Sequence, residues 1–236
     1  GLGDVYKRQE HDLDSLECKA GQFFMLQAGV GTEPLLKRPF SIFSHKPPML
    51  HFLYRIVGIG TLRLSQRLKG EMIEVIGPLG RPYPKPEGSF IAIAGGSGIA
   101  SIRCLLEENN GLGYLFYGAS DRRELVLVDR LEWFCKNVVY TTDDGSFGIK
   151  GTVVDALKGS FNEFAPMPIY ACGPRPMLKA ISLWAMDRGI PCYVSLEERM
   201  ACGIGACLSC VTETNDGLKA ICKEGPVFSA VELIWD

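Results

Sequence analysis

The sequence predicts a chain of mixed β and α/β class that ends in a cysteine-rich loop. In its first part, short apolar runs are separated by Gly, Pro and charged residues, which is typical of a small antiparallel β-barrel. In its second part, buried-strand runs alternate with helical stretches, which indicates a parallel α/β sheet. Three closely spaced cysteines follow. We expect the three regions to span residues 10–86, 89–197 and 198–236.

Composition limits the partners of the chain. Its 236 residues are 47% hydrophobic, enough for one large or two ordinary domains with a buried core. Lys plus Arg number 25 against 27 Asp plus Glu, so no overall field attracts nucleic acid or an anionic membrane surface. No apolar run approaches the roughly 18 to 20 residues of a membrane span. Nine cysteines, an odd number, and no apolar N-terminal segment disfavour disulfides. We therefore expect a soluble, cytoplasmic protein.

The first region is predicted from its apolar runs. We exclude residues 1–9 from the fold as foreign to the native chain, because they start without Met and show neither strand alternation nor a helix stripe. One helix is expected over 61–68, and three prolines between 82 and 86 mark a stiff linker. Strands are expected at 22–27, 40–43, 50–57 and 72–76.

The second region begins with a buried-strand run at 90–94, a Gly-Gly-Ser-Gly turn and a helix to residue 108. The last expected strand, 192–196, leads into the cysteine loop, so we expect that loop to be an appended module. Between them we expect strands at 114–117, 137–141 and 169–172, and a clear helix at 177–188.

Two turns of this region suit a dinucleotide. A glycine-rich turn between strand and helix offers backbone N–H groups and a helix dipole to a pyrophosphate. A Cys-Gly-Pro turn follows a later strand. Either turn alone is equally consistent with an ordinary structural turn. Both, however, follow strand C-termini, the edge where open α/β sheets bind ligands. The predicted dinucleotide residues are Gly95, Gly96, Gly98, Cys172, Gly173 and Pro174.

The first region offers a flavin cradle. Arg38-Pro-Phe-Ser41 places a guanidinium for phosphate, an aromatic for a ring and a hydroxyl for a heteroatom within four residues. In isolation, the same residues fit a strand with an exposed Arg and a buried Phe. Gly58-Ile-Gly-Thr61 then opens the helix, with Thr61 as the expected N-cap and free N–H groups for a second phosphate contact. The two motifs together favour a flavin-binding site over an ordinary strand.

The cysteine loop suits an iron–sulfur cluster. Cys202, Cys207 and Cys210 are separated by four and then two residues, the plant-type spacing of a [2Fe–2S] cluster, and Cys222 is the expected fourth ligand. The alternative is structural zinc, which usually takes cysteines as two short-spaced couples. The other five cysteines are expected to be small core residues: Cys18, Cys104, Cys135, Cys172 and Cys192.

The order of these motifs resembles the ferredoxin-NADP reductase superfamily with a C-terminal [2Fe–2S] loop. More narrowly, four stretches resemble the family of electron-transfer subunits of dihydroorotate dehydrogenase B: residues 77–80, 172–179, 195–207 and 222–228. The resemblance covers the chain from Lys19 to its C-terminus.

The resemblance implies an electron relay. A partner subunit carrying FMN would oxidise dihydroorotate in pyrimidine biosynthesis, and electrons would cross the [2Fe–2S] cluster and FAD to NAD. It also implies a heterotetramer of two catalytic and two electron-transfer subunits. Because the cofactors perform the redox chemistry, we expect no catalytic acid or base here. FAD would be held by Arg38, Pro39, Phe40, Ser41, Leu53, Tyr54, Arg55, Gly60 and Thr61.

Two departures and one alternative accompany the resemblance. The family's first barrel strand should precede Lys19, but only about ten residues separate Lys19 from the excluded segment 1–9. We therefore expect that strand to be missing and one edge of the barrel to be unpaired. After the second α/β strand, Asp121 could accept a ribose hydroxyl, whereas Arg122 and Arg123 could accept a 2'-phosphate. The resemblance implies NAD, but these residues leave NADP open. The alternative is a diaphorase subunit of a hydrogenase, sulfite reductase or ferredoxin-NADP transhydrogenase complex.

Overall fold

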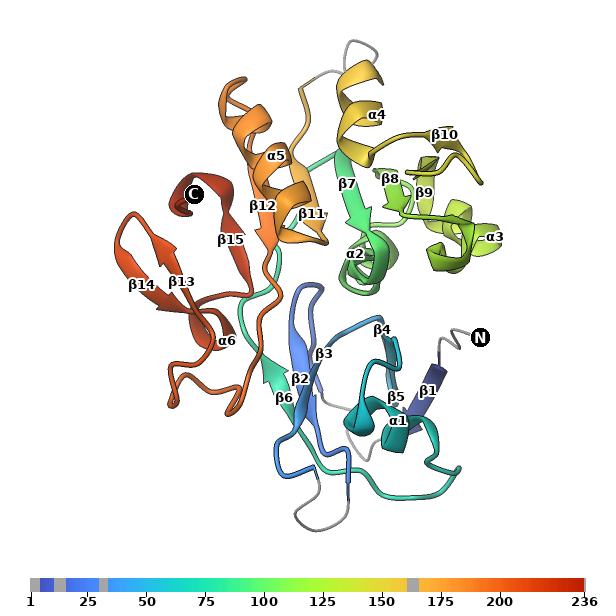
Figure 1. Ribbon diagram of the computed structural model, residues 1–236, viewed down its shortest axis with the longest axis vertical. Helices are drawn as coiled ribbons and strands as arrows, with labels where there is room; N and C mark the ends of the chain where they lie inside the picture. Colours follow the sequence, from blue (N-terminus) through green and yellow to red (C-terminus); the bar gives the residue numbers. More distant parts are fainter. Residues whose placement is uncertain (1–4, 11–15, 30–33, 161–165, 236) are drawn as a thin grey trace.

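The computed structural model describes residues 5–10, 16–29, 34–160 and 166–235, and its first region is antiparallel as predicted (Figure 1). Its strands form two three-stranded sheets, and one short helix, α1, spans Ile59–Ser65. One sheet has the order β1 (Val5–Glu10), β5 (Met49–Tyr54), β4 (Ser44–Lys46), and the other β3 (Arg38–Ser41), β2 (Phe23–Leu26), β6 (Val75–Leu79).

The two sheets are joined by the segment after β3, where Ile42 N–H donates to Gln22 and Phe43 N–H donates to His51, and they pack through aromatic side chains. The ring of Phe24 in β2 lies 5.8 Å from that of Phe52 in β5. The edge strands β3 and β6 contain Pro39 and Pro78, which lack the N–H group needed to extend a ladder. The structure thus confirms an antiparallel region, which the described residues build from two linked sheets.

The N-terminal segment corrects another expectation. Strand β1 pairs antiparallel with β5, from Val5 opposite Tyr54 to Glu10 opposite Met49. The exclusion of residues 1–9 from the fold was therefore wrong, and β1 covers one edge of β5, whereas an unpaired barrel edge was expected. Ladder hydrogen bonds use backbone groups, so an edge strand can form without a recognisable side-chain alternation.

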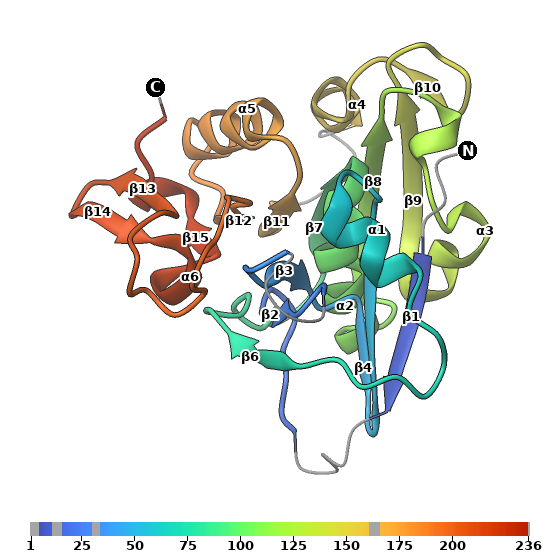
Figure 2. The ribbon, with the colours of Figure 1, turned by 60° about the horizontal axis from the view of Figure 1, so that its bottom comes forward.

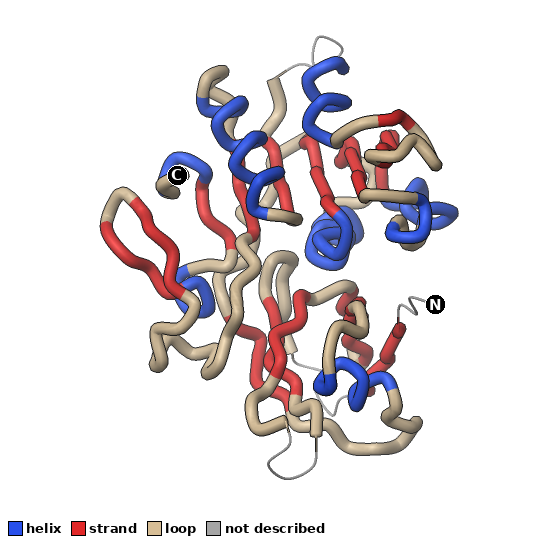
Figure 3. The backbone as a smooth tube through the Cα atoms, in the orientation of Figure 1, coloured by secondary structure: helices blue, strands red, loops and turns tan. Residues whose placement is uncertain are grey.

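The second region is a seven-stranded sheet with helices on both faces (Figure 3). Helices α2 (Ile99–Glu108) and α3 (Val128–Leu131) share one core, and α4 (Val153–Ser160) and α5 (Arg175–Met186) share the other. The strand order is β10 (Ile149–Lys150), β9 (Cys135–Thr142), β8 (Gly113–Ala119), β7 (Phe90–Gly95), β11 (Ile169–Cys172), β12 (Cys192–Ser195), β15 (Val227–Ser229). The first six strands are parallel, which confirms the predicted sheet.

The cysteine region begins and ends in this sheet. After β12 the chain forms the cysteine loop, the hairpin β13 (Val211–Thr214) and β14 (Gly217–Ala220), and the turn of helix α6 (Ile221–Glu224) (Figure 2). It then returns as β15, antiparallel to β12. We had expected β12 to be the last strand, and this prediction was wrong, because β15 follows it in the sheet. Three residues are too few to show a strand period.

The two regions are joined by polar contacts and by the proline-rich linker. At the end of α2, Glu107 accepts a hydrogen bond from Ser44 and pairs with Lys46 at 2.9 Å. Linker residue Tyr83 is buried, and its backbone N–H donates to Ala20 at 2.9 Å. The antiparallel region is thus docked on α2. No helix in the described residues is long and apolar enough to cross a membrane.

Candidate redox centre and nucleotide cavity

The fold brings the remote fourth cysteine to the other three. Cys202 and Cys207 lie in the loop after β12, Cys210 directly precedes β13, and Cys222 is in α6. The backbone N–H of Gly205 donates to the sulfur of Cys222 at 3.1 Å. The four cysteines therefore belong to one local site.

Backbone contacts link the four cysteines as two pairs. The N–H of Cys207 donates to the sulfur of Cys202 at 3.4 Å, and the N–H of Ile221, next to Cys222, donates to the carbonyl oxygen of Cys210 at 2.8 Å. In the described part of the chain, no three His, Cys, Asp or Glu side chains converge as the ligands of one ion would. A [2Fe–2S] cluster takes two protein ligands on each of its irons. The paired arrangement fits such a cluster.

The local chemistry favours thiolate at the first pair. The hydrogen bond with Ser209 lowers the pKa of Cys207 to about 6, and the N–H of Ile204 lowers the pKa of Cys202. Burial instead raises the pKa of Cys222 to about 12. Since the thiolate is the form that binds metal, Cys222 would release its proton on binding.

The loop rests directly on the antiparallel region. Gly203 has a φ of +74°, and a Cβ at this position would lie 2.6 Å from Cγ of Met25 in β2 and 3.3 Å from Cδ1 of Leu79. Glycine is needed for both the left-handed backbone and the close contact. The cysteine loop therefore packs on the sheet that includes the predicted flavin strand β3.

The predicted flavin residues also gather. Arg38, Pro39, Phe40 and Ser41 form β3, Leu53 and Tyr54 end β5, and Arg55 follows them. A Cβ at Gly60 would lie 3.0 Å from Nε of Arg38, so that guanidinium lies against the first turn of α1.

Tyr54 supplies a test of fit. Its ring lies 5.1 Å from that of Phe40, and burial raises its pKa to about 12. Its hydroxyl is buried without a hydrogen-bond partner among the residues described. An unpaired buried hydroxyl is costly, so it indicates a ligand heteroatom nearby. The residues present fit a flavin.

Thr61 has a different local role from the one expected. Gly58 is the N-cap of α1, and Thr61 is the third helical residue. The Thr61 hydroxyl accepts hydrogen bonds from the N–H groups of Val57 at 3.0 Å and Gly58 at 3.2 Å. The N-cap prediction was wrong, because a threonine three residues into a helix can bond back to the cap instead.

A cavity of about 300 Å³ joins the two regions. The two predicted dinucleotide turns meet beside it, since a Cβ at Gly98 would overlap the carbonyl oxygen of Cys172. These two residues lie behind the wall, whereas Gly95, Gly96, Gly173 and Pro174 form part of it. The wall comprises Arg55, Gly95, Gly96, Ser97, Glu124, Gly173, Pro174, Arg175 and Glu197.

Four of these residues were not predicted from the sequence: Ser97, Glu124, Arg175 and Glu197. Glu197 is an exposed residue of the cavity wall, and desolvation by the protein around its carboxyl raises the pKa of that group. Its Oε1 accepts a hydrogen bond from Cys172 at 3.8 Å. Glu197 lies in the Glu-Glu-Arg stretch before Cys202, and nothing in the sequence distinguishes it from Glu198, which is also exposed.

The loop after β8 leaves ribose recognition undecided. Arg123 pairs with Asp121 at 2.6 Å, and this hydrogen bonding lowers the pKa of Asp121. The guanidinium of Arg122 lies 4.9 Å from the centre of the Phe147 ring and donates to the carbonyl of Leu125. Both arginines and the acid thus have partners within the α/β region.

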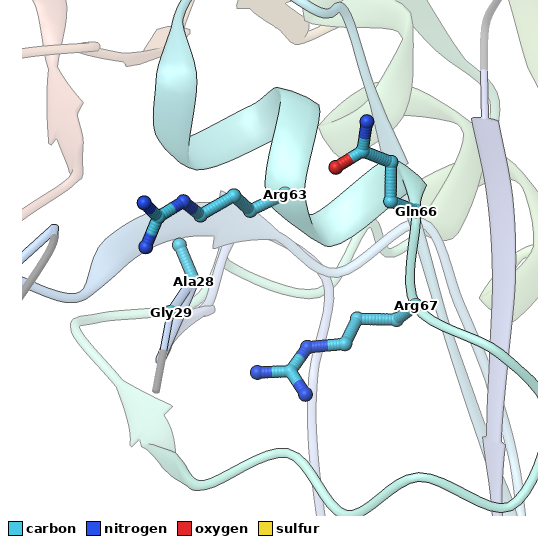
Figure 4. Close-up of a pocket in the computed structure, with 5 residues that line it drawn as sticks. All are labelled: Ala28, Gly29, Arg63, Gln66 and Arg67. Atoms are coloured by element: carbon cyan, nitrogen blue, oxygen red, sulfur yellow. The ribbon is translucent and has the colours of Figure 1, made fainter. Parts of the chain in front are cut away.

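A second cavity, of about 250 Å³, lies beside α1 and was also missed. Figure 4 shows the side chains of Arg63 and Arg67 extending to the same side as Ala28 and Gly29. Gln66 completes the lining. Arg67 also pairs with Glu71 at 3.0 Å. The spacing of the two arginines gave no signal, because charges at helix spacing usually form a solvated face.

The cysteine loop and the α/β sheet match known family models. The model of the "iron-sulfur cluster binding domain of dihydroorotate dehydrogenase B" matches residues 197–234, and the "oxidoreductase NAD-binding domain" matches 92–182. Fold and site therefore define an oxidoreductase subunit with an NAD-binding domain and an iron–sulfur domain.

Known proteins are similar to this chain over most of their length. The dihydroorotate dehydrogenase B (NAD(+)) electron transfer subunit of Desulforamulus reducens is 39% identical, covering 92% of this chain and 87% of that protein. The corresponding subunit of Clostridium acetobutylicum is 37% identical with the same coverage. The chain belongs to the family of dihydroorotate dehydrogenase B electron-transfer subunits.

A solved structure described as giving insights into flavin-based electron bifurcation is also similar. It is that of the NADH-dependent reduced ferredoxin-NADP oxidoreductase, with a TM-score of 0.83 and 30% identity. The match covers 100% of this chain and 91% of that one.

Proposed function

We propose that this chain passes electrons from an FMN-containing dihydroorotate dehydrogenase subunit to NAD in pyrimidine biosynthesis, with a [2Fe–2S] cluster and FAD as its carriers. The observation that supports this best is the shared cavity. Arg55 of the antiparallel region faces the same space as both glycine turns of the α/β region. A flavin on the first region and a nicotinamide on the second would meet there.

Each carrier has its own residues in the proposal. Cys202, Cys207, Cys210 and Cys222 would hold the cluster, which supplies a one-electron carrier. Arg38 would hold an FAD phosphate, Phe40 and Tyr54 would line the ring, and Pro39, Ser41, Leu53, Arg55, Gly60 and Thr61 complete the set. When bound, FAD accepts single electrons and transfers pairs as a hydride.

The NAD residues are proposed from the cavity wall. Gly95 and Gly96, before α2, would approach the pyrophosphate beside Gly173 and Pro174, and Gly98 and Cys172 would support these two turns from behind the wall. We propose NAD as the nucleotide because the named relatives are NAD(+) enzymes.

The proposal assigns the chain to a heterotetramer of two catalytic and two electron-transfer subunits in the cytoplasm. Residues 10–86 would bind FAD, residues 89–197 NAD, and residues 198–236 the cluster. No acid or base of this chain is assigned to catalysis, because dihydroorotate would react on the partner.

Separating the two activities tests the function. The isolated chain, loaded with FAD and the cluster, should oxidise NADH with ferricyanide but leave dihydroorotate unreacted. Adding the FMN-containing subunit should restore dihydroorotate-dependent NADH formation. If the isolated chain oxidised dihydroorotate, the relay would be refuted.

A second candidate is a diaphorase subunit of another complex. The full-length similarity to the NADH-dependent reduced ferredoxin-NADP oxidoreductase structure favours it. Reconstitution decides between them, since that candidate predicts electron exchange with reduced ferredoxin in the matching complex and none with dihydroorotate and the FMN subunit.

A further inference from the structure

One ion pair crosses the cavity between the two regions. Nη1 of Arg55, just after β5, lies 3.1 Å from Oε1 of Glu124, which follows β8 in the α/β region. The two side chains are 34% and 25% exposed, so ligands can reach both groups.

The backbone of Glu124 is anchored behind the cavity. The Tyr117 hydroxyl donates to the carbonyl oxygen of Glu124 at 3.5 Å, and the N–H of Val126 donates to that hydroxyl at 3.2 Å. Tyr117 is fully buried. Only the side chain of Glu124 therefore needs to move for its carboxylate to leave Arg55.

The charges of the wall are balanced before a ligand enters. Arg55 and Arg175 face two carboxylates, Glu124 and Glu197. A dinucleotide would add the negative charges of its phosphates. A guanidinium binds a carboxylate and a phosphate with the same two-pronged geometry, so the two anions compete for it.

We propose that Glu124 is a stand-in anion on Arg55, and that a phosphate of the entering dinucleotide displaces it. The inference rests on the proposed function, because it takes this cavity to be a dinucleotide site. Glu124 then weakens nucleotide binding twice, by occupying Arg55 and by repelling phosphate. It also gives Arg55 a partner when the nucleotide leaves, which suits a substrate that must exchange in every turnover.

The phosphate could come from FAD or from NAD, and binding measurements distinguish them. The full chain with its cluster would be compared with Glu124→Gln for FAD dissociation constant by equilibrium dialysis. The FAD-loaded proteins would then be titrated with NAD+ by calorimetry. We expect about two- to fivefold tighter binding of the nucleotide that uses Arg55, from the usual strength of partly exposed charge pairs. Added salt should shrink this gain.

Two further variants make the test specific. Asp129→Asn removes one negative charge at an exposed position of α3 outside the cavity wall, and should change neither constant. Arg55→Gln should weaken binding of the same nucleotide. In the Arg55→Gln background the gain from Glu124→Gln should be smaller, because only repulsion is then removed.

Unchanged or weaker binding of both nucleotides in Glu124→Gln would overturn the inference, since Glu124 would then be a bystander or a direct ligand. In that case the wild-type chain would still bind NAD+ and reduce ferricyanide with NADH. If the wild-type chain did neither, the proposed function and this inference would both fall.

Discussion

Gly205 donates its backbone N–H to the sulfur of Cys222, a residue 17 positions later in the chain. This contact joins the cysteine loop to helix α6. The position of the remote cysteine is thus set by the protein's own hydrogen bonds. Amide donors to sulfur also stabilise negative charge, which a thiolate cluster needs.

Cys207→Ser should remove the cluster and leave FAD bound, because the flavin residues lie on the antiparallel sheets and not in the loop. Iron, labile-sulfide and flavin analysis of anaerobically purified protein would measure both. Cys135→Ser is the matched control, since that thiol lies outside the cysteine loop and donates to the carbonyl of Leu131, and serine keeps a donor there. Two irons retained in Cys207→Ser would contradict the ligand assignment.

Gly203→Ala should destabilise the protein through both strain and overlap with Met25. The left-handed backbone alone costs a residue with a Cβ about 1 to 2 kcal/mol. Overpacking adds about 1 to 3 kcal/mol. Gly217→Ala separates the two terms, because Gly217 has a φ of +98° but no described atom within 4 Å of an added Cβ. Urea unfolding should rank Gly203→Ala clearly below Gly217→Ala; equal losses would disprove the contact.

Arg38→Ala should lower FAD affinity by about 1.5 to 3 kcal/mol, the range for hydrogen bonds to charged groups. Equilibrium dialysis of the flavin would measure it. Arg130→Ala is the control, because Arg130 is exposed on α3, in the other region. Unchanged affinity would leave Arg38 with a structural role at the carbonyl of Leu36, to which it donates at 2.6 Å.

Glu197 should make stability depend on pH. Desolvation raises the pKa of its carboxyl, so the folded protein holds this proton more tightly than the unfolded chain. That contribution is fully present below the unfolded pKa and is lost as pH rises through the folded one. The free energy of unfolding of the Glu197→Gln protein should therefore rise relative to that of the wild type as pH increases from the unfolded to the folded pKa of this carboxyl. Urea unfolding at several pH values would show it; a pH-independent difference would refute it.

The sequence predicted what depends on local pattern. The cysteine spacing, the two glycine turns and the buried strand at 90–94 needed no distant information, and the structure has each of the corresponding elements. Strands β1 and β15 were missed because edge pairing depends on a partner strand far away in the chain. Glu124 and Glu197 were missed for the same reason, since a carboxylate becomes part of a cavity only when another region faces it.

The return of β15 beside β12 makes the cysteine region an insertion within a hairpin. Ser195 pairs with Val227, so the chain leaves and re-enters the sheet at adjacent positions. Neighbouring antiparallel strands are about 5 Å apart and can be joined by a two-residue turn. An ancestor without the redox loop could therefore have had a short β-turn here, and acquiring the loop would have left the register of the sheet intact. The same geometry offers protein engineers one place at which to exchange whole electron-carrier modules between reductases.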